Sequence, residues 1–199
     1  MLRYKTFAPN SSAQDEAIYV GIGLDLEKRD FVAWEPGVGP QYLPVKDLSI
    51  LPDTSSEIAT GVALASKLHR LGPLVLSFMS RPSELSRSAL LLAAEHKLPI
   101  IYVQKNAPLS TNVIGDAMYG FPVMAVDASD AIAIYRVAQE AIYRARMGGG
   151  PTLLACCQLE EKDPLAYMEH YLEKKGLWSA TWKTKLDRML AQQFRNSGV

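Results

Sequence analysis

Residues 74–107 read LVLSFMSRPSELSRSALLLAAEHKLPIIYVQKNA, and this stretch decides the fold. A short apolar run, a segment opened by a proline and a second continuous apolar run predict a strand, a helix and another strand. Continuous apolar strands that alternate with helices are typical of a parallel sheet covered on both faces. Ligands of such sheets bind where the strands end. Here that end reads Phe78-Met79-Ser80, which contains no carboxylate, no glycine and no nucleophile beside a base.

The same alternation continues on both sides of this stretch. We expect helices over 54–71 and 129–147, the second capped by Ser129 and ended by three glycines, and strands at 121–129 and 152–159. A further helix begins after Asp163, and an amphipathic helix forms the tail. The N-terminal part predicts a short helix at 11–26, capped by Ser11 or Ser12, followed by a loop at 28–52 rich in proline and glycine. We expect a single α/β domain over 1–199 with an N-terminal segment at 1–53, a sheet core at 54–160 and C-terminal helices at 161–199.

Composition excludes several classes of partner. Lys plus Arg and Asp plus Glu both count 21, so no net charge favours nucleic acid or an anionic membrane. We expect a cytoplasmic protein, because there is no apolar run of membrane-spanning length and no secretory signal. The two cysteines, Cys156 and Cys157, are adjacent in an apolar run. Neighbouring strand residues point to opposite faces, so we expect both thiols to be buried and reduced.

Several segments resemble the alpha subunit of thiamine diphosphate-dependent 2-oxoacid dehydrogenases of the pyruvate and acetoin type. The most specific feature is the order Tyr-Gly-hydrophobic-Pro, Val-Asp, helix, Ala-Arg and Gly-Pro-Thr-Leu, which recurs in that family. The resemblance implies a three-layer α/β sandwich with a mainly parallel sheet and helices on both faces, of the diphosphate-binding type. The segments that carry it are SSEIATGVALASKLHRLGPLVLSFMS (55–80), SALLLAAEHKLPIIYVQKN (88–106), YGFPVMAVDASDAIAIYRVAQEAIYRARMGGGPTLLACC (119–157) and EKDPLAYMEHYLEKKGLW (161–178).

The resemblance also implies a cofactor site, and the residues that build it in the family are missing. The family has Gly-Asp-Gly after one strand and an asparagine pair after the next, which together hold the Mg²⁺ of the cofactor. Magnesium requires oxygen ligands in near-octahedral geometry. Ser77, Phe78 and Met79 replace the first motif, and Asn106 and Ala107 stand at the second. Phe78 and Ala107 therefore occupy the ligand positions and offer no side-chain oxygen.

Two further departures affect the same site. The family binds the diphosphate through a Tyr-Arg pair, whereas residues 30–45 contain no Arg or Lys and have Trp34-Glu35 instead. The family's long loop with a catalytic histidine corresponds here to the short QLEEKD at 158–163. We therefore expect no thiamine diphosphate, no metal and no catalytic residue. Phe78, Met79, Trp34 and Tyr42 would then fill the vacated volume.

Two other groups of residues remain as candidates. Ser80, Arg81 and Ser83 at a helix N-terminus form a candidate anion site, although we favour an ordinary helix cap as their explanation. Gly61 and Ala65, on the small-residue helix, are the candidate interface of a homodimer. The alternative is that they pack against the chain's own sheet. No histidine has a nucleophile or carboxylate partner at the spacing of a catalytic triad.

Three functions follow as hypotheses. The chain is a non-catalytic homologue that serves as a structural or regulatory subunit, or it is a working alpha subunit paired with a separate dehydrogenase beta subunit. As a third alternative, it is a module that binds a small anion in the crevice at the strand ends.

Overall fold

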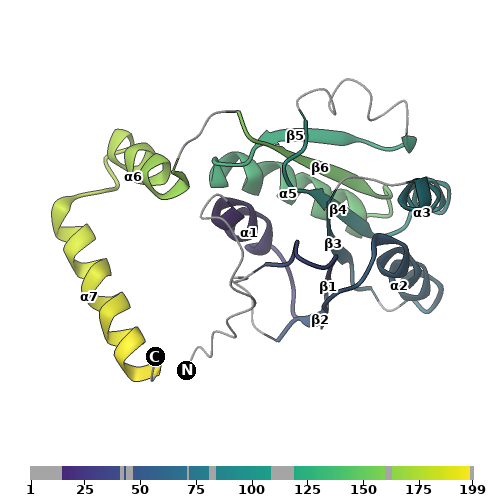
Figure 1. The fold of residues 1–199 in the computed structure, drawn as a ribbon, viewed down its shortest axis with the longest axis horizontal. Coiled ribbons are helices and arrows are strands. Elements are labelled where there is room, and N and C mark those ends of the chain that lie inside the picture. Colours follow the sequence, from purple (N-terminus) through teal and green to yellow (C-terminus); the bar gives the residue numbers. More distant parts are fainter. Residues whose placement is uncertain are drawn as a thin grey trace.

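A computed structural model describes residues 15–40, 43, 47–70, 72–80, 84–108, 119–159 and 163–197. The predicted cap residues Ser11 and Ser12, together with Tyr42, Arg81 and Ser83, lie outside these ranges. The helices are α1 (Asp15–Gly23), α2 (Ser56–Leu68), α3 (Glu84–Glu95), α5 (Ala131–Arg146), α6 (Pro164–Lys174) and α7 (Ala180–Ser197). The strands are β1 (Phe31–Trp34), β2 (Ser49–Leu51), β3 (Val75–Met79), β4 (Ile100–Gln104), β5 (Val123–Asp127) and β6 (Thr152–Cys157) (Figure 1).

The six strands form one sheet in the order β2-β1-β3-β4-β6-β5, and every neighbouring pair is parallel. The predicted parallel sheet is confirmed. All strands therefore end at the same edge. Trp34 lies beside Phe78, and Met79 lies beside Gln104, so the ends of β1, β3 and β4 are adjacent.

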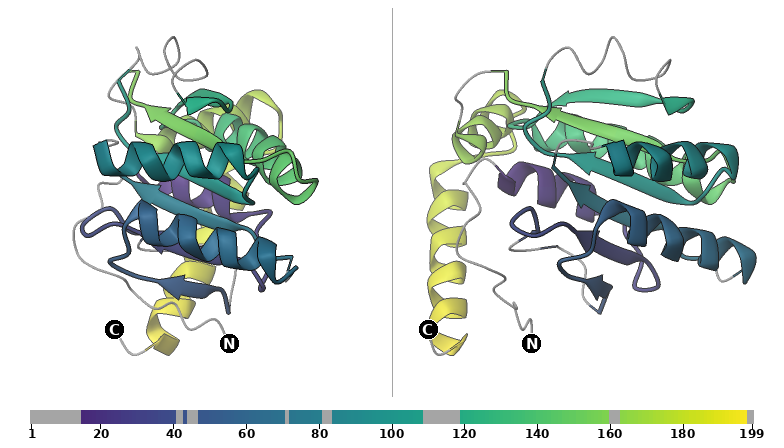
Figure 2. Two further views of the ribbon diagram at one scale, coloured as in Figure 1. Left: turned by 90° about the vertical axis from the view of Figure 1, so that its right-hand side faces the viewer. Right: turned by 45° about the vertical axis from the view of Figure 1, so that its right-hand side comes forward.

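Helices cover both faces of the sheet, which makes the three-layer sandwich (Figure 2). Alternate strand residues enter two separate cores, as the two-residue period of a strand requires. Leu76 and Phe78 of β3 join the core under α1 and α5, whereas Val75 and Met79 join the core under α2 and α3. The chain thus buries β3 on both faces, which explains why every residue of β3 except Ser77 is apolar.

Two expectations about local structure are wrong. Residues 28–52 contain the strands β1 and β2 in addition to loop, so the sheet extends into the segment 1–53. These strands are four and three residues long, and pairing of β1 with β3 and of β2 with β1 forms them where local sequence gives little signal. The cap of α5 is Asp130 and not Ser129. The Asp130 carboxylate accepts hydrogen bonds from the amides of Ile132 and Ala133, at 3.0 and 2.9 Å.

The small residues of α2 divide between its two faces. Ala59 and Ala63 are completely buried and let the helix lie close to the sheet. Gly61 and Ala65 are exposed, and a side chain added at Gly61 would meet no atom within 4 Å. The alternative that these two residues pack on the chain's own sheet is therefore wrong.

The two cysteines lie as expected, on opposite faces of β6. Cys156 faces the α1 and α5 core, Cys157 faces the α2 and α3 core, and neither forms a disulfide. The C-terminal helices α6 and α7 lie at one side of the sandwich, and α7 extends away from the sheet (Figure 1). In the part of the chain that the structure describes, no helix is both long and apolar enough to cross a bilayer.

Candidate functional site

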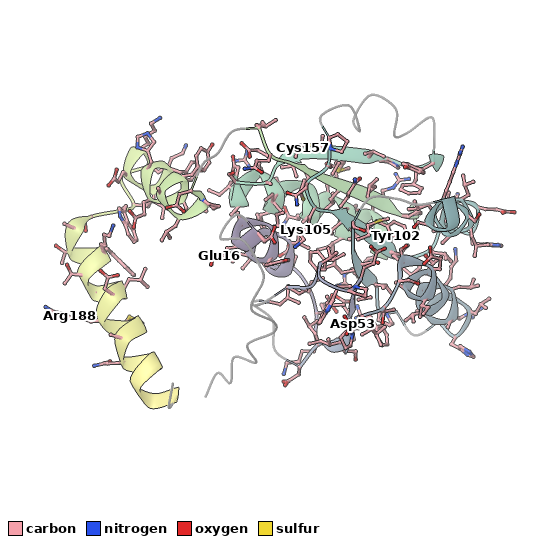
Figure 3. All side chains as sticks on the ribbon, viewed as in Figure 1. Glu16, Asp53, Tyr102, Lys105, Cys157 and Arg188 are labelled. Carbon is pink, nitrogen blue, oxygen red and sulfur yellow. The ribbon has the colours of Figure 1, made fainter. Side chains whose placement is uncertain are left out.

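The carboxyl ends of β3 and β4 meet the start of α1. Four side chains converge there, and we call them the strand-end cluster: Asp15 and Tyr19 from α1, Phe78 from β3, and Lys105 directly after β4. The predicted helix 11–26 places the first two on one face, because residues four apart are neighbours on a helix. Figure 3 shows Lys105 beside α1.

An ion pair joins the two charged members of the cluster. The Nζ atom of Lys105 lies 2.7 Å from Oδ2 of Asp15, and each side chain is only 10% exposed. The same Nζ donates a hydrogen bond to the Tyr19 hydroxyl at 2.8 Å. A pair this well shielded from water is screened little, and either charge left alone would carry a large desolvation penalty. The Lys105 ammonium group is therefore already paired with Asp15 and Tyr19 of the same chain.

Tyr19 connects the ion pair to Phe78. Its ring meets the Phe78 ring edge to face, with centroids 5.4 Å apart and an interplanar angle of 75°. Its hydroxyl lies 3.1 Å from the carbonyl oxygen of Gly39 and 3.3 Å from that of Val38, both in the loop after β1. Burial, reinforced by the Asp15 carboxylate, raises the pKa of Tyr19 well above its usual value. The hydroxyl is thus neutral and ties this loop to α1.

The positions that would hold magnesium do not fit it. Phe78 is completely buried and Ala107 is 5% exposed, so an aromatic ring and a methyl group replace two oxygen ligands. Asn106 is exposed on a turn with φ of 52°, and the buried Ser77 hydroxyl has no hydrogen-bond partner. Met79 is buried on the α2 and α3 side. Among the described residues, no three His, Cys, Asp or Glu side chains gather into a cluster that could hold a metal ion.

Of the three residues of the candidate anion site, the structure describes only Ser80, and Glu35 already accepts the hydrogen bonds that Ser80 donates. The backbone amide and the hydroxyl of Ser80 both donate to Oε2 of Glu35, at 3.0 and 2.7 Å. Glu35 follows β1 and is the second residue of the Trp34-Glu35 pair that replaces the family's Tyr-Arg. Arg81 and Ser83 lie outside the described residues.

Asp15, Tyr19 and Lys105 were missed by sequence reasoning. Lys105 directly follows a predicted buried strand, which was a usable signal, since polar residues at strand ends line the ligand edge of a parallel sheet. Asp15 and Tyr19 gave no comparable signal. Their contact with Lys105 joins residues separated by 90 and 86 positions in the chain, and only the fold brings them together.

Solved structures with the same architecture define the fold class. A Mycobacterium smegmatis enzyme described as thiamin diphosphate-dependent superposes with a TM-score of 0.56 over 72% of this chain and 31% of its own, at 18% identity. Benzoylformate decarboxylase from Polynucleobacter necessarius also gives 0.56, over 81% of this chain and 36% of its own, at 15% identity. The likeness is one of fold: both enzymes share the α/β arrangement with a parallel sheet that this chain shows.

Sequence comparisons find relatives among dehydrogenase subunits. A family model described as Dehydrogenase E1 component matches residues 87–159. The alpha subunit of the pyruvate dehydrogenase E1 component from Acholeplasma laidlawii is 24% identical, over 98% of this chain and 75% of its own length. The alpha subunits of acetoin:2,6-dichlorophenolindophenol oxidoreductase from Bacillus subtilis and Cupriavidus necator are each 33% identical, over 42% and 48% of this chain. The chain is a homologue of E1 dehydrogenase alpha subunits, and it spans 36% and 33% of the two acetoin relatives.

Proposed function

We propose that this chain is a non-catalytic homologue of E1 alpha subunits, which does not bind thiamine diphosphate with magnesium and serves as a structural or regulatory subunit. The strand-end cluster is the observation that carries the proposal. Its aromatic rings and its ion pair occupy the edge of the sheet where the resemblance implies a cofactor.

The charges at this edge support the same proposal. A diphosphate needs unpaired cations and donors, but Lys105 is paired with Asp15 and the Ser80 donors are paired with Glu35. Binding would first have to break the Lys105–Asp15 pair, which is largely shielded from water, and the exposed hydrogen bonds between Ser80 and Glu35. No new oxygen ligand at Phe78 or Ala107 would compensate.

The alternative is a working alpha subunit paired with a separate beta subunit. The relatives favour it, since those named above are alpha subunits of oxidoreductases or of a dehydrogenase component. It requires magnesium to be held without side-chain oxygens at positions 78 and 107, which carry Phe and Ala. The third hypothesis, a small-anion module at the strand ends, is weakened because Glu35 already takes the Ser80 donors.

A second copy of the chain is the partner that we propose for the subunit role. Ile58, Gly61, Ala65 and Leu68 lie on one exposed face of α2, and the two large residues are 61% and 70% exposed. If two such helices pack antiparallel about a twofold axis, Ile58 of one copy faces Leu68 of the other, and Gly61 faces Ala65. The small central residues permit close approach. Glu57 in the first turn would then lie near the basic end of the other helix.

A thermal-shift experiment with thiamine diphosphate and magnesium tests the proposed loss of the cofactor. A ligand present at 100 times its dissociation constant stabilises the folded state by about 2.7 kcal/mol, which corresponds to roughly 5–10 °C for a chain of this size. We expect no shift beyond that given by magnesium and inorganic diphosphate. A magnesium-dependent shift of several degrees that needs the thiamine portion would instead support the working alpha subunit.

A further inference from the structure

A cavity lies at the opposite edge of the sheet, where β3 and β4 begin. Its volume is about 220 Å³, and its walls include Pro73, Leu74 and Pro99. Four cationic residues also line it, from the ends of α2, α3 and α5: Lys67, Arg70, Lys97 and Arg146. Neither the proposed function nor the strand-end cluster involves this edge.

Two of the four cations are already paired. The Nζ atom of Lys67 donates to the carbonyl oxygens of His96 and Lys97, at 2.5 and 3.2 Å, and so covers the negative end of α3. Arg146 contacts the completely buried Asp30 at 2.6 Å and Glu27 at 3.3 Å. These contacts satisfy the nearby carbonyls and carboxylates.

The other two cations have no such partner. Among the described residues, no side-chain hydrogen bond or ion pair is made by Arg70 or Lys97. Both are exposed at the cavity. The cavity therefore carries two positive charges that the described part of the chain leaves unneutralised.

The backbone at these two residues is unusual. Arg70 has φ of 53° and Lys97 has φ of 45°, in the left-handed region that glycine normally occupies after a helix. The other non-glycine residues with positive φ in the described ranges are aspartates and an asparagine, whose short polar side chains tolerate this region. Arg and Lys have no such local compensation. An unfavourable conformation kept at a cavity indicates a use for the side chain.

The same turn occurs twice. LHRLGP follows α2 and EHKLP follows α3, and in each a histidine precedes the basic residue and a leucine follows it. Because β3 and β4 are neighbours and α2 packs on α3, the two turns bring Arg70 and Lys97 to one cavity.

We propose that this cavity binds a small organic oxyanion, with a carboxylate or phosphate group between Arg70 and Lys97. The apolar walls formed by Pro73, Leu74 and Pro99 would contact the rest of the molecule. The volume limits the ligand to a few carbon atoms in addition to its charged group. The guanidinium group of Arg70 and the ammonium group of Lys97 can both donate hydrogen bonds to an oxyanion. Such charge-assisted hydrogen bonds are stronger than hydrogen bonds between neutral groups.

Calorimetry and thermal shift on the full chain test this proposal, with inorganic phosphate, pentanoate and chloride compared at equal ionic strength. We expect phosphate or pentanoate, at millimolar concentration, to raise the melting temperature above the value in chloride. The comparison of the two oxyanions distinguishes a phosphate site from a carboxylate site.

Variants at the two left-handed positions make the test specific. The double variant Arg70→Gly, Lys97→Gly replaces both residues by glycine, which adopts the left-handed conformation without strain. In chloride, this variant should have a melting temperature no lower than that of the wild type. It should also lose the whole increase in melting temperature that the oxyanion causes. The swap Arg70→Lys, Lys97→Arg should retain the shift, as should Arg188→Gln on α7, which removes a distant charge. An unshifted wild type, or a double glycine variant that keeps the shift, would overturn the proposal.

Discussion

Lys105 at the end of β4 and Asp15 at the start of α1 are separated by 90 positions in the chain and by 2.7 Å in the fold. Both side chains are 10% exposed, so their attraction is little screened by solvent. Through this pair the chain uses the ligand edge of its sheet to hold α1 in place. Ligands of parallel α/β sheets bind at this edge, and in this chain the same edge carries a contact between two elements of the fold.

Lys105→Met should strongly destabilise the fold. The substitution leaves the Asp15 carboxylate buried without its partner, and breaking a buried pair in this way costs about 3–5 kcal/mol. Urea denaturation measures the change. Lys28→Met is the matched control, because the Lys28–Asp47 pair is 75% exposed on both sides and should contribute at most about 1 kcal/mol. The double variant Asp15→Leu, Lys105→Met should be more stable than Lys105→Met alone. If Lys105→Met were as stable as the control, the cluster would have no structural role.

Asp30→Ala should also destabilise the fold, at the other edge of the sheet. The Asp30 carboxylate accepts hydrogen bonds from the amides of Glu27 and Leu74 and from both terminal nitrogens of Arg146. Its removal leaves the buried Leu74 amide without an acceptor and Arg146 with Glu27 as its remaining carboxylate partner, at a cost of about 3 kcal/mol or more. Chemical denaturation compared with Asp187→Ala, an exposed aspartate on α7, measures the difference. Equal stability of the two variants would contradict this assignment.

Stability should fall as the pH rises above about 9. Burial raises the pKa of the Cys156 thiol to about 12, and burial also raises that of Cys157. Above the ordinary thiol pKa the unfolded chain loses these protons and the folded chain keeps them, so the unfolded state is favoured by up to about 1.4 kcal/mol per pH unit for each thiol. Stability is fully present below that pKa and is lost as the pH rises towards the folded values. The free energy of unfolding of the wild type and of the double variant Cys156→Ala, Cys157→Ala can be measured between pH 8 and 10. Relative to its value at pH 8, it should fall less in the double variant than in the wild type.

Gly61→Leu should separate the proposed dimer without unfolding the chain. A side chain at Gly61 meets open space within one copy, and leucine favours the helix more than glycine does. It would, however, push apart two α2 helices that meet at Gly61 and Ala65. Light scattering after size-exclusion chromatography should give the mass of a dimer for the wild type and for Gln139→Leu, and the mass of one chain for Gly61→Leu. A wild type that stays monomeric at micromolar concentration would rule out the homodimer.

The sequence predicted the elements whose pattern is local. The largely apolar runs of β3, β4 and β6 and the Asp163 cap of α6 depend on neighbouring residues, so they are readable in the chain. The expected helix 54–71 is longer than α2, which ends at Leu68. The short strand β1 depends on pairing with β3, and β2 depends on pairing with β1, so local sequence does not encode them.

At the candidate site, the resemblance assigns the expected metal ligands to positions 78 and 107, where the sequence has Phe and Ala. The sequence did not predict the contacts that surround Phe78. Asp15 and Tyr19 come from a segment that matches the family only loosely, and their roles arise from contacts across the fold.

Isothermal titration calorimetry of the full chain with thiamine diphosphate, in the presence of magnesium, tests the central claim most directly. The account predicts heats equal to those of dilution, for the wild type and also for the double variant Phe78→Asp, Ala107→Asn. That variant restores two ligand types but leaves Lys105 paired and Trp34-Glu35 in place. Saturable, magnesium-dependent binding to the wild type with a micromolar dissociation constant would contradict the account and identify the chain as a cofactor-binding alpha subunit.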